Sequence, residues 1–345
     1  MMRAWSVLPD EWKGALAARG LRPFRAEQVL HALYRDMIAS WDEATTLPKD
    51  VREDMKREFP LTAAEVLDSA RSADGTEKLL VGFEDGECVE TVLIPARDRF
   101  TQCISTQAGC AMGCAFCASG AKGLARSLTA DEIVAQHLIA RRRAQVTNLV
   151  VMGMGEPFAN YDETMRALKL INAGKGPNLG ARHITISTCG IVPGIERLAG
   201  EGVQFELSVS LHAPNDELRS AIMPINRRWP VEALMDACAA YTRSTKRAIT
   251  FEYTLVGGFN DSAAAARELA ALVKQVPLAK VNLIPLSPVD HRPDLHRPEE
   301  GAMMAFLDVL MKNGVQTMLR RSRGSDASAA CGQLRMRERP SRNSS

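Results

Sequence analysis

The feature that most constrains the fold is a repeated alternation between apolar, strand-like segments and segments of helical period, which begins near residue 100. The strand-like segments are FTQCIST, NLVVMGMG, HITISTCG, QFELSVSLH, AITFEYTLV and KVNLIPLSP. Segments of helical period lie between them, for example residues 129–143 and 261–276. This alternation predicts an α/β fold with a parallel sheet covered by helices, either doubly wound or curved into a full or partial barrel.

The same pattern predicts where the chemistry takes place. In folds of this class, ligands bind at the carboxyl ends of the strands. Polar residues and glycines that fall at or just after these ends are Cys110, Gly155, Ser187, His212 and Asn282. We therefore expect a functional site among these residues.

Two regions of different pattern precede the alternation. Residues 1–62 are expected to form a helical domain, because apolar residues recur near helical spacing and Pro48 can begin a further helix that Pro60 ends. The recurring apolar residues are Phe24, Val29, Leu30, Leu33 and Tyr34. Residues 63–98 hold two segments rich in Leu and Val around Asp85-Gly86, which predicts a β-hairpin extension. We assign residues 99–324 to the barrel and 325–345 to a basic C-terminal segment.

Composition excludes several classes of protein. Hydrophobic residues make up 46% of the 345 residues and charged residues 24%, which are the values of a globular protein rather than a disordered or fibrous one. The chain has no run of 18 apolar residues, and its first twenty residues lack the apolar stretch of a signal peptide. We therefore expect a cytoplasmic protein with no membrane association. In that compartment its eight cysteines are expected to be metal ligands, catalytic thiols or buried residues, not a set of structural disulfides.

Three cysteines lie close together directly after the first strand of the alternation. Cys110, Cys114 and Cys117 occur in GCAMGCAFCASG, where Gly113 lies between the first two and Ser119-Gly120 follows the third, so ordinary core packing is a poor explanation. Three thiolates in one loop can hold three irons of a four-iron cluster and leave the fourth iron open to a small molecule. Zinc is the alternative, but it normally takes a fourth protein ligand, which Cys103 or a histidine would have to supply.

The CxxxCxxC spacing resembles the signature of radical S-adenosylmethionine (SAM) enzymes, and Phe116 fits the aromatic residue that usually precedes the third cysteine. The resemblance extends over nearly the whole chain to the RlmN/Cfr family of adenosine methyltransferases, and more to its RlmN side. It rests on FRAEQVLHALYRDMIASWDEATTLPKDVRE, ECVETVLIP, CISTQAGCAMGCAFC, GMGEP, ISTCGIVPGI, SLHAPND, PINRRWP, VNLIP and RGSDASAACGQL in this order. The resemblance implies a partial (β/α)6 barrel with an N-terminal accessory domain. It also implies a [4Fe-4S] cluster on the three cysteines and the use of two SAM molecules per turnover.

The resemblance further implies three catalytic residues. Cys331 corresponds to the cysteine that is first methylated by one SAM and then, after a second SAM generates a radical, carries the methylene group to adenine. Cys103 corresponds to the cysteine that removes the ring proton and closes a transient disulfide with Cys331. Glu90 corresponds to a glutamate described as a proton acceptor, a role that overlaps with that of Cys103; its alternative is a solvent-facing strand residue.

Further positions correspond to the family's SAM contacts. A carboxylate in the GMGEP motif can accept from the SAM amino group, and glycine lets the backbone approach a ligand. Small polar groups at later strand ends can bond the ribose hydroxyls and the adenine edge. The expected contacts are Gly155, Glu156, Ser187, Ser210, Leu211, His212 and Asn282. Cys88, Cys189 and Cys238 have no corresponding role and are expected to be structural.

The resemblance implies an RNA substrate, namely 23S rRNA, with tRNA as a second substrate in some members. The net charge of +2 neither demands nor excludes nucleic acid. Basic residues that could contact phosphates are Arg141–Arg143, Arg227, Arg228, Arg320, Arg321, Arg323 and the C-terminal tail, although Arg141–Arg143 fit a solvated helix face equally well. An electron donor such as flavodoxin and a monomeric state are also implied.

Three other functions stay open from the sequence. The first is methylation of carbon 8 instead of carbon 2, as in Cfr; the proline of GMGEP and the INRRWP string lean toward RlmN. The second is a non-catalytic, zinc-bearing RNA-binding protein, which iron and sulfide content would distinguish. The third is another radical SAM reaction such as sulfur insertion, which usually needs a second set of cluster cysteines that this sequence lacks.

Overall fold

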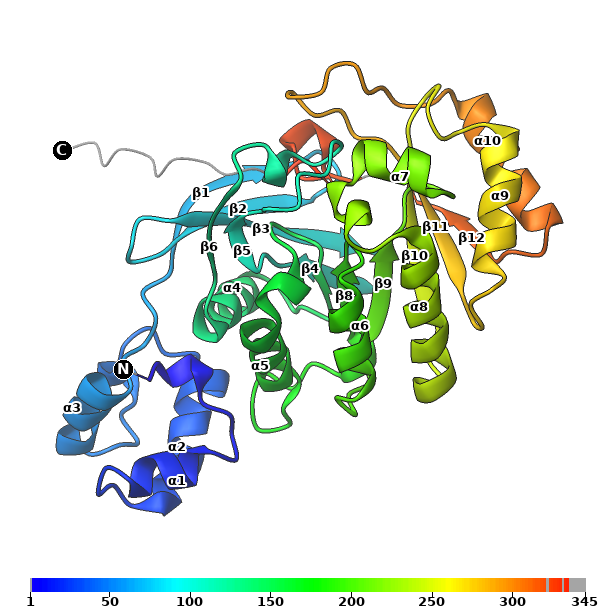
Figure 1. Cartoon of the computed structure of the whole chain (residues 1–345). Coiled ribbons are helices and arrows are strands. Elements are labelled where there is room, and N and C mark those ends of the chain that lie inside the picture. The colour runs from blue at the N-terminus through cyan, green and yellow to red at the C-terminus, as the bar shows by residue number, and fades with distance from the viewer. Residues whose placement is uncertain (1, 321–322, 331, 335–345) are drawn as a thin grey trace.

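A computed structural model describes residues 2–320, 323–330 and 332–334. Its main feature is one ten-stranded sheet with the order β1-β2-β3-β4-β7-β8-β9-β10-β11-β12 (Figure 1). A helical domain at the N-terminus lies to one side of this sheet (Figure 1). No helix among the described residues is long and apolar enough to span a membrane.

The barrel part of the sheet consists of parallel strands that alternate with helices. The strands are β4 (Arg99–Cys103), β7 (Asn148–Val151), β8 (Ile184–Thr188), β9 (Glu206–Ser210), β10 (Ile249–Leu255), β11 (Lys280–Pro285) and β12 (Thr317–Leu319). The helices are α4 (Ala130–Arg143), α5 (Tyr161–Asn172), α6 (Val192–Ala199), α7 (Asp216–Ile222), α8 (Val231–Thr245), α9 (Ala263–Val273) and α10 (Glu300–Lys312). Within the described residues the sheet does not close on itself, so the predicted partial barrel is confirmed.

The predicted hairpin is confirmed and is larger than the sequence indicated. Strands β2 (Glu77–Gly82) and β3 (Cys88–Ala96) are antiparallel, and Gly86 takes the positive φ of 92° that the tight turn between them requires. A further strand, β1 (Glu65–Arg71), pairs with β2, and β3 pairs with β4. The extension is therefore continuous with the barrel sheet. A separate two-stranded sheet joins β5 (Gln107–Gly109) to β6 (Leu124–Ser127).

The N-terminal domain contains α1 (Trp12–Ala17), α2 (Ala26–His31), a π-helical continuation (Ala32–Asp36) and α3 (Lys49–Glu58). Pro48 caps α3, as expected. Aromatic residues of the domain pack together, and the ring centroids of Trp12 and Phe59 lie 4.9 Å apart. Phe24 is an exception, because it is 58% exposed. It lies in a short 3-10 helix (Pro23–Arg25), where the tighter winding turns it away from the apolar face that the helical spacing predicted.

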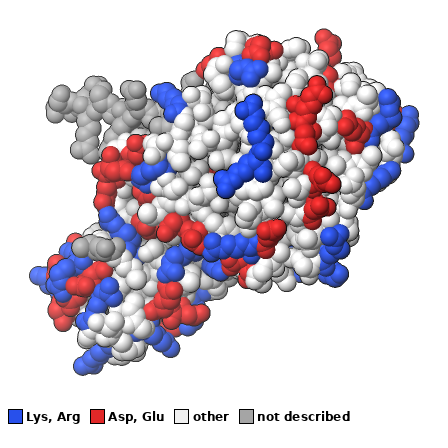
Figure 2. Space-filling view, viewed as in Figure 1, with Lys and Arg blue, Asp and Glu red and all other residues white. Residues whose placement is uncertain are grey.

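The arginines at the end of α4 contact both the N-terminal domain and the β-hairpin extension. Arg141 and Arg142 donate to the backbone carbonyls of Tyr34 and Met37, and Arg143 pairs with Glu77 at 2.9 Å. All three arginines therefore bind groups of the protein itself. They do not form a purely solvated helix face, and they are not free to contact phosphates. On the face shown in Figure 2, Lys and Arg alternate with Asp and Glu over the N-terminal domain and do not gather in one basic patch.

Candidate functional site

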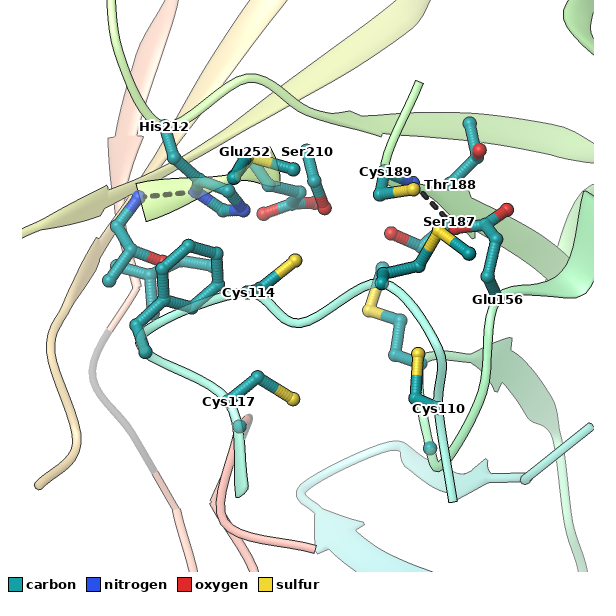
Figure 3. A pocket seen from close by; sticks show the side chains of 18 of the residues that line it. Cys110, Cys114, Cys117, Glu156, Ser187, Thr188, Cys189, Ser210, His212 and Glu252 are labelled. Carbon is teal, nitrogen blue, oxygen red and sulfur yellow. Dashed lines mark hydrogen bonds between the residues drawn. The ribbon is translucent and has the colours of Figure 1, made fainter. Parts of the chain in front are cut away.

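A cavity of about 150 Å³ lies at the carboxyl ends of the barrel strands (Figure 3). The wall contains all three residues of the cysteine motif, both residues of the Gly-Glu pair and polar residues from β8 and β9. Residues expected from the sequence that line it are Cys110, Cys114, Cys117, Gly155, Glu156, Ser187, Ser210 and His212. The structure thus brings together residues that are far apart in the sequence, as the strand–helix alternation predicted.

The cysteine loop begins directly after β5. Gly113 takes a positive φ of 63°, and the loop is fixed by backbone hydrogen bonds from Cys110 to Gly123 and from Ala115 to Ile222. Burial raises the pKa of the Cys110 thiol to about 11, and it raises the pKa of Cys114 further. A thiolate in this cavity therefore needs a neighbouring positive charge, which bound iron provides.

Glu156 is buried at the end of the loop that follows β7, where it is the N-cap residue of a 3-10 helix (Pro157–Asn160). Its carboxylate accepts from the backbone N–H of Cys189 at 2.7 Å and of Phe158 at 3.0 Å, so it connects the ends of β7 and β8. Burial raises its pKa, and these hydrogen bonds partly oppose the rise. Hydrogen bonds from the side chains of Thr188 and Cys189 to this carboxylate also lower its pKa. Gly155 has a φ of 100°, and a Cβ there would lie 2.6 Å from Gln107 Cβ, so the turn requires glycine.

His212 follows β9 and is neutral. Burial lowers its pKa to about 3, with a smaller contribution from the charge of Arg219. Its Nδ1 accepts from the backbone N–H of Thr254 at 2.8 Å, which places the proton on Nε2. The imidazole also packs edge-on against Phe116, with ring centroids 4.5 Å apart. His212 therefore offers one N–H donor and an apolar face at the rim of the cysteine loop (Figure 3).

Comparison with known proteins agrees with this geometry. Residues 104–270 match the family model described as the radical SAM superfamily. The chain is 45% identical over 340 residues to a probable dual-specificity RNA methyltransferase RlmN of Staphylococcus carnosus, covering 97% of this chain and 93% of that protein. It is 44% identical, with the same coverage, to a protein of the same name from Geobacillus kaustophilus. The chain belongs to the RlmN family.

A solved structure supports the same family at the level of the fold. The chain is similar, with a TM-score of 0.94 and 47% identity, to a radical SAM methyltransferase from Sphaerobacter thermophilus, over 97% of this chain and 99% of that one. The protein is a radical SAM methyltransferase of the RlmN type. Membership implies a [4Fe-4S] cluster and SAM.

The cavity of this RlmN-family protein fits both groups. Among the described residues, no three His, Cys, Asp or Glu side chains form a group able to hold a metal ion on their own. The sulfurs of Cys110, Cys114 and Cys117 instead surround a space, and a cluster suits this arrangement because it gives each thiolate a separate iron (Figure 3).

Glu252 lines the cavity and was not predicted from the sequence. Its Oε2 is buried and has no hydrogen-bond partner within the described residues, so it can accept from a bound ligand such as the hydroxyl or amino groups of SAM. Asn282, an expected SAM contact, does not line the cavity, and its amide donates to Glu252 Oε1 at 3.2 Å. Leu211 does not line it either; its side chain is fully buried and its carbonyl accepts from Arg219.

Cys103 lies in a second cavity of about 250 Å³. The wall combines apolar residues with three arginines, one of which, Arg99, lies on β4. It is formed by Ile94, Ala96, Arg99, Thr101, Cys103, Val150, Met152, Ile284, Arg320, Arg323, Ala329 and Ala330. Met152 and Ile284 also line the first cavity, so the two cavities share a wall.

The remaining catalytic candidates and the unassigned cysteines have different settings. Glu90 on β3 is buried, not solvent-facing, and its carboxylate lies 3.1 Å from the ammonium of Lys78. Cys331 lies outside the described residues, and so does its expected contact with Cys103.

Cys238 is a core residue of α8, as predicted. Cys189, expected to be only structural, lines the first cavity between Cys114 and Glu156.

Proposed function

We propose that this protein methylates carbon 2 of an adenosine in 23S rRNA and, as a second substrate, in tRNA. The RNA substrate is supported by the relatives described above, whose names call them dual-specificity RNA methyltransferases. One SAM would methylate Cys331, and a second would be the radical source, beside one [4Fe-4S] cluster per chain on Cys110, Cys114 and Cys117. A reduced protein such as flavodoxin would supply the electron, and the protein would act as a monomer in the cytoplasm.

The observation that carries the proposal is the shared wall between the two cavities. The first cavity holds the three cluster cysteines, and the second holds Cys103. Ala330 lines the second cavity, and Gly332 lines the first. A cofactor in one cavity and an RNA base in the other would therefore both lie next to the chain segment that includes position 331.

The second cavity suits a nucleotide. Its apolar residues, which include Ile94 and Val150, can pack against a purine ring, and Arg99, Arg320 and Arg323 can contact phosphates. An adenosine in folded RNA must leave its stack to enter such a cavity. The exposed residues Arg227 and Arg228 follow Pro224, which packs against Gly113 of the cysteine loop, so they offer further phosphate contacts near the site.

The chemistry follows from the electron-poor character of carbon 2, which does not attack the methyl group of SAM. When bound, the cluster and SAM supply radical chemistry that a protein side chain cannot. Glu156 would accept from the amino group of SAM, and His212 Nε2–H would donate to an acceptor atom of SAM such as a ribose oxygen or an adenine ring nitrogen. The Cys331 sulfur would carry the transferred carbon to the base. Glu90 or Cys103 would take the ring proton. The Cys103 thiolate would then attack the Cys331 sulfur and break the bond between that sulfur and the transferred carbon, which takes up a proton to become the methyl group. The resulting disulfide would be reduced by an external thiol before the next turnover.

Trapping experiments test this division of roles. With cluster, SAM, reductant and unmodified 23S rRNA, we expect Cys103→Ala to accumulate a covalent protein–RNA adduct that gel electrophoresis and mass spectrometry locate on Cys331. Cys331→Ala should give neither adduct nor product. Cys238→Ala is the matched control, because Cys238 is a core thiol and its loss should leave turnover intact. Multiple turnover by Cys103→Ala without an adduct would contradict the role of Cys103.

A further inference from the structure

Lys78 is a buried lysine that contacts two parts of the proposed machinery at once. Its side chain on β2 is 3% exposed, and that of Glu90 on β3 is 1% exposed. The strand register pairs Lys78 with Val92, so Glu90 is the diagonal neighbour two residues away on the same face. The ammonium lies 3.1 Å from Glu90 Oε1 and donates to the carbonyl of Ser328 at 2.9 Å. Charged groups this deeply buried are stable only when they are paired and hydrogen-bonded.

Ser328 belongs to a segment, residues 323–330, that is bound along the turn between β1 and β2. The backbone N–H of Gly324 donates to Asp74 at 3.1 Å. Asp326 accepts from the Ser72 hydroxyl and, at 3.0 Å, from the backbone N–H of Ala73. A Cβ on Gly324, which has a φ of 68°, would lie 2.8 Å from a Thr76 methyl group. The turn and the segment are therefore fitted closely to each other.

Beyond position 331, the chain is bound to the cysteine loop. The carbonyl of Gly332 accepts from Ala118 N–H at 2.7 Å, and the carbonyl of Leu334 accepts from the Ser119 hydroxyl at 2.6 Å. Both flanks of position 331 thus have defined binding partners. Lys78 contacts both the 323–330 segment, at Ser328, and Glu90.

We propose that Lys78 is a positioning residue that couples the binding of segment 323–330 to the orientation of the Glu90 carboxylate. A single ammonium on a flexible stem holds both a carbonyl of the segment and the carboxylate, so displacement of one changes the constraint on the other. The proposal rests on the proposed function only for the roles of Glu90 and Cys331. The contact itself gives the protein a way to keep its proton acceptor in place while the segment that leads to Cys331 is seated.

Hydrogen exchange in the full-length protein without RNA tests the coupling through a double-mutant cycle. Ala329 N–H, which bonds to the carbonyl of Gly324 at 2.8 Å, reports on the segment. Losing a hydrogen bond from a charged donor should speed exchange in peptides of residues 324–330 about tenfold in Lys78→Met. Glu90→Gln should also change this exchange in the parent protein, but it should have no further effect when Lys78 is already Met.

A double variant and a control variant complete the double-mutant cycle. Lys78→Met removes the buried ammonium that pairs with Glu90, so the neutral pair Lys78→Met with Glu90→Gln keeps the measurement available if the single variant folds poorly. Lys169→Met is the matched control, because Lys169 on α5 pairs with Glu201 and not with Glu90 or Ser328, and it should not alter exchange at 324–330. Unchanged exchange in Lys78→Met, or equal effects of Glu90→Gln in both backgrounds, would overturn the proposal.

Activity gives a second readout. In single turnover with unmodified 23S rRNA, Lys78→Met should lower the rate of methylation at least tenfold with little change in the KM for RNA, and Lys78→Arg should recover part of the rate. A positioning role would be contradicted if Lys78→Met and Lys78→Arg lost equal activity and the loss appeared only as a higher KM for RNA. If the wild-type protein does not methylate RNA at all, the proposed function fails, and the exchange cycle still decides whether Lys78 couples the two elements.

Discussion

Arg219 gives the sharpest prediction about how the site is held together. It lies on α7, is 0% exposed, and spreads its donors over the ends of two neighbouring strands. Nε donates to the carbonyl of Leu211 at 3.1 Å, and Nη1 donates to Asn226 Oδ1 at 2.8 Å. Nη2 donates to the carbonyls of Cys189 at 2.7 Å and Ser210 at 3.2 Å. Burial lowers its pKa.

Replacing Arg219 by Met keeps most of the apolar stem and removes every donor. Four acceptors then lose a partner in the protein interior, and each such loss costs about 1–3 kcal/mol before the structure relaxes. Some of this cost is recovered because the buried charge is removed as well. We expect the free energy of unfolding to fall by about 3–5 kcal/mol, and the affinity for SAM to fall because the Cys189 and Ser210 carbonyls frame the cavity.

Urea unfolding of the wild-type protein and the variant at equal cluster content measures this change. Arg197→Met is the matched control, since Arg197 is 52% exposed and pairs with Asp162 at the surface. An exposed pair of this kind contributes at most about 1 kcal/mol. A loss below about 1 kcal/mol in Arg219→Met would refute the argument that this arginine fixes the strand ends.

Three further predictions follow from the same structure. Gly155→Ala should fold but bind SAM at least about tenfold more weakly in calorimetry, because a Cβ at φ 100° meets Gln107; unchanged affinity would show that the turn adapts. Cys114→Ala should lose the iron and sulfide that the wild type holds, whereas zinc at one equivalent in the wild type would contradict a cluster. Burial lowers the pKa of His137 to about 3, against about 6.5 when unfolded, so stability is lost as pH falls. From pH 7 to pH 5, His137→Gln should lose about 2 kcal/mol less unfolding free energy than the wild type.

Periodicity was sufficient to predict six of the seven parallel strands, but it did not indicate the short strand β12 or the strand β1. The six apolar segments from β4 to β11 stand out because buried parallel strands are nearly continuous apolar runs. Strand β1, with the sequence EVLDSAR, is largely polar and partly exposed, so it lacks that signal. Phe24 was misplaced because helical spacing does not indicate where a 3-10 turn interrupts the helix.

The site was predicted where its residues follow strand ends or form a spaced motif. The three cysteines and the Gly-Glu pair are of this kind, and all of them line one cavity. Glu252 was missed because it lies inside the apolar run of β10, where only the register decides which way a side chain points. Asn282 was expected in the wall, but it is in the middle of β11 and bonds to Glu252 instead.

Contacts between segments that are distant in the sequence could not be predicted from it. Lys78 and Ser328 are 250 residues apart, and neither belongs to a motif with a chemical signature. The same holds for Asp326, whose partners lie in the turn between β1 and β2. Such contacts depend on how the C-terminal segment folds back over the sheet, which periodicity does not determine.

The most direct test of the central claim is a nucleoside analysis. The protein would be reconstituted anaerobically with iron and sulfide and supplied with SAM, a reductant and 23S rRNA that lacks the modification. Digested nucleosides would then be compared by mass spectrometry with 2-methyladenosine and 8-methyladenosine standards. The account predicts 2-methyladenosine, absent when Cys331 is Ala. Formation of 8-methyladenosine, or of 5′-deoxyadenosine with no methylated adenosine in either RNA substrate, would contradict it.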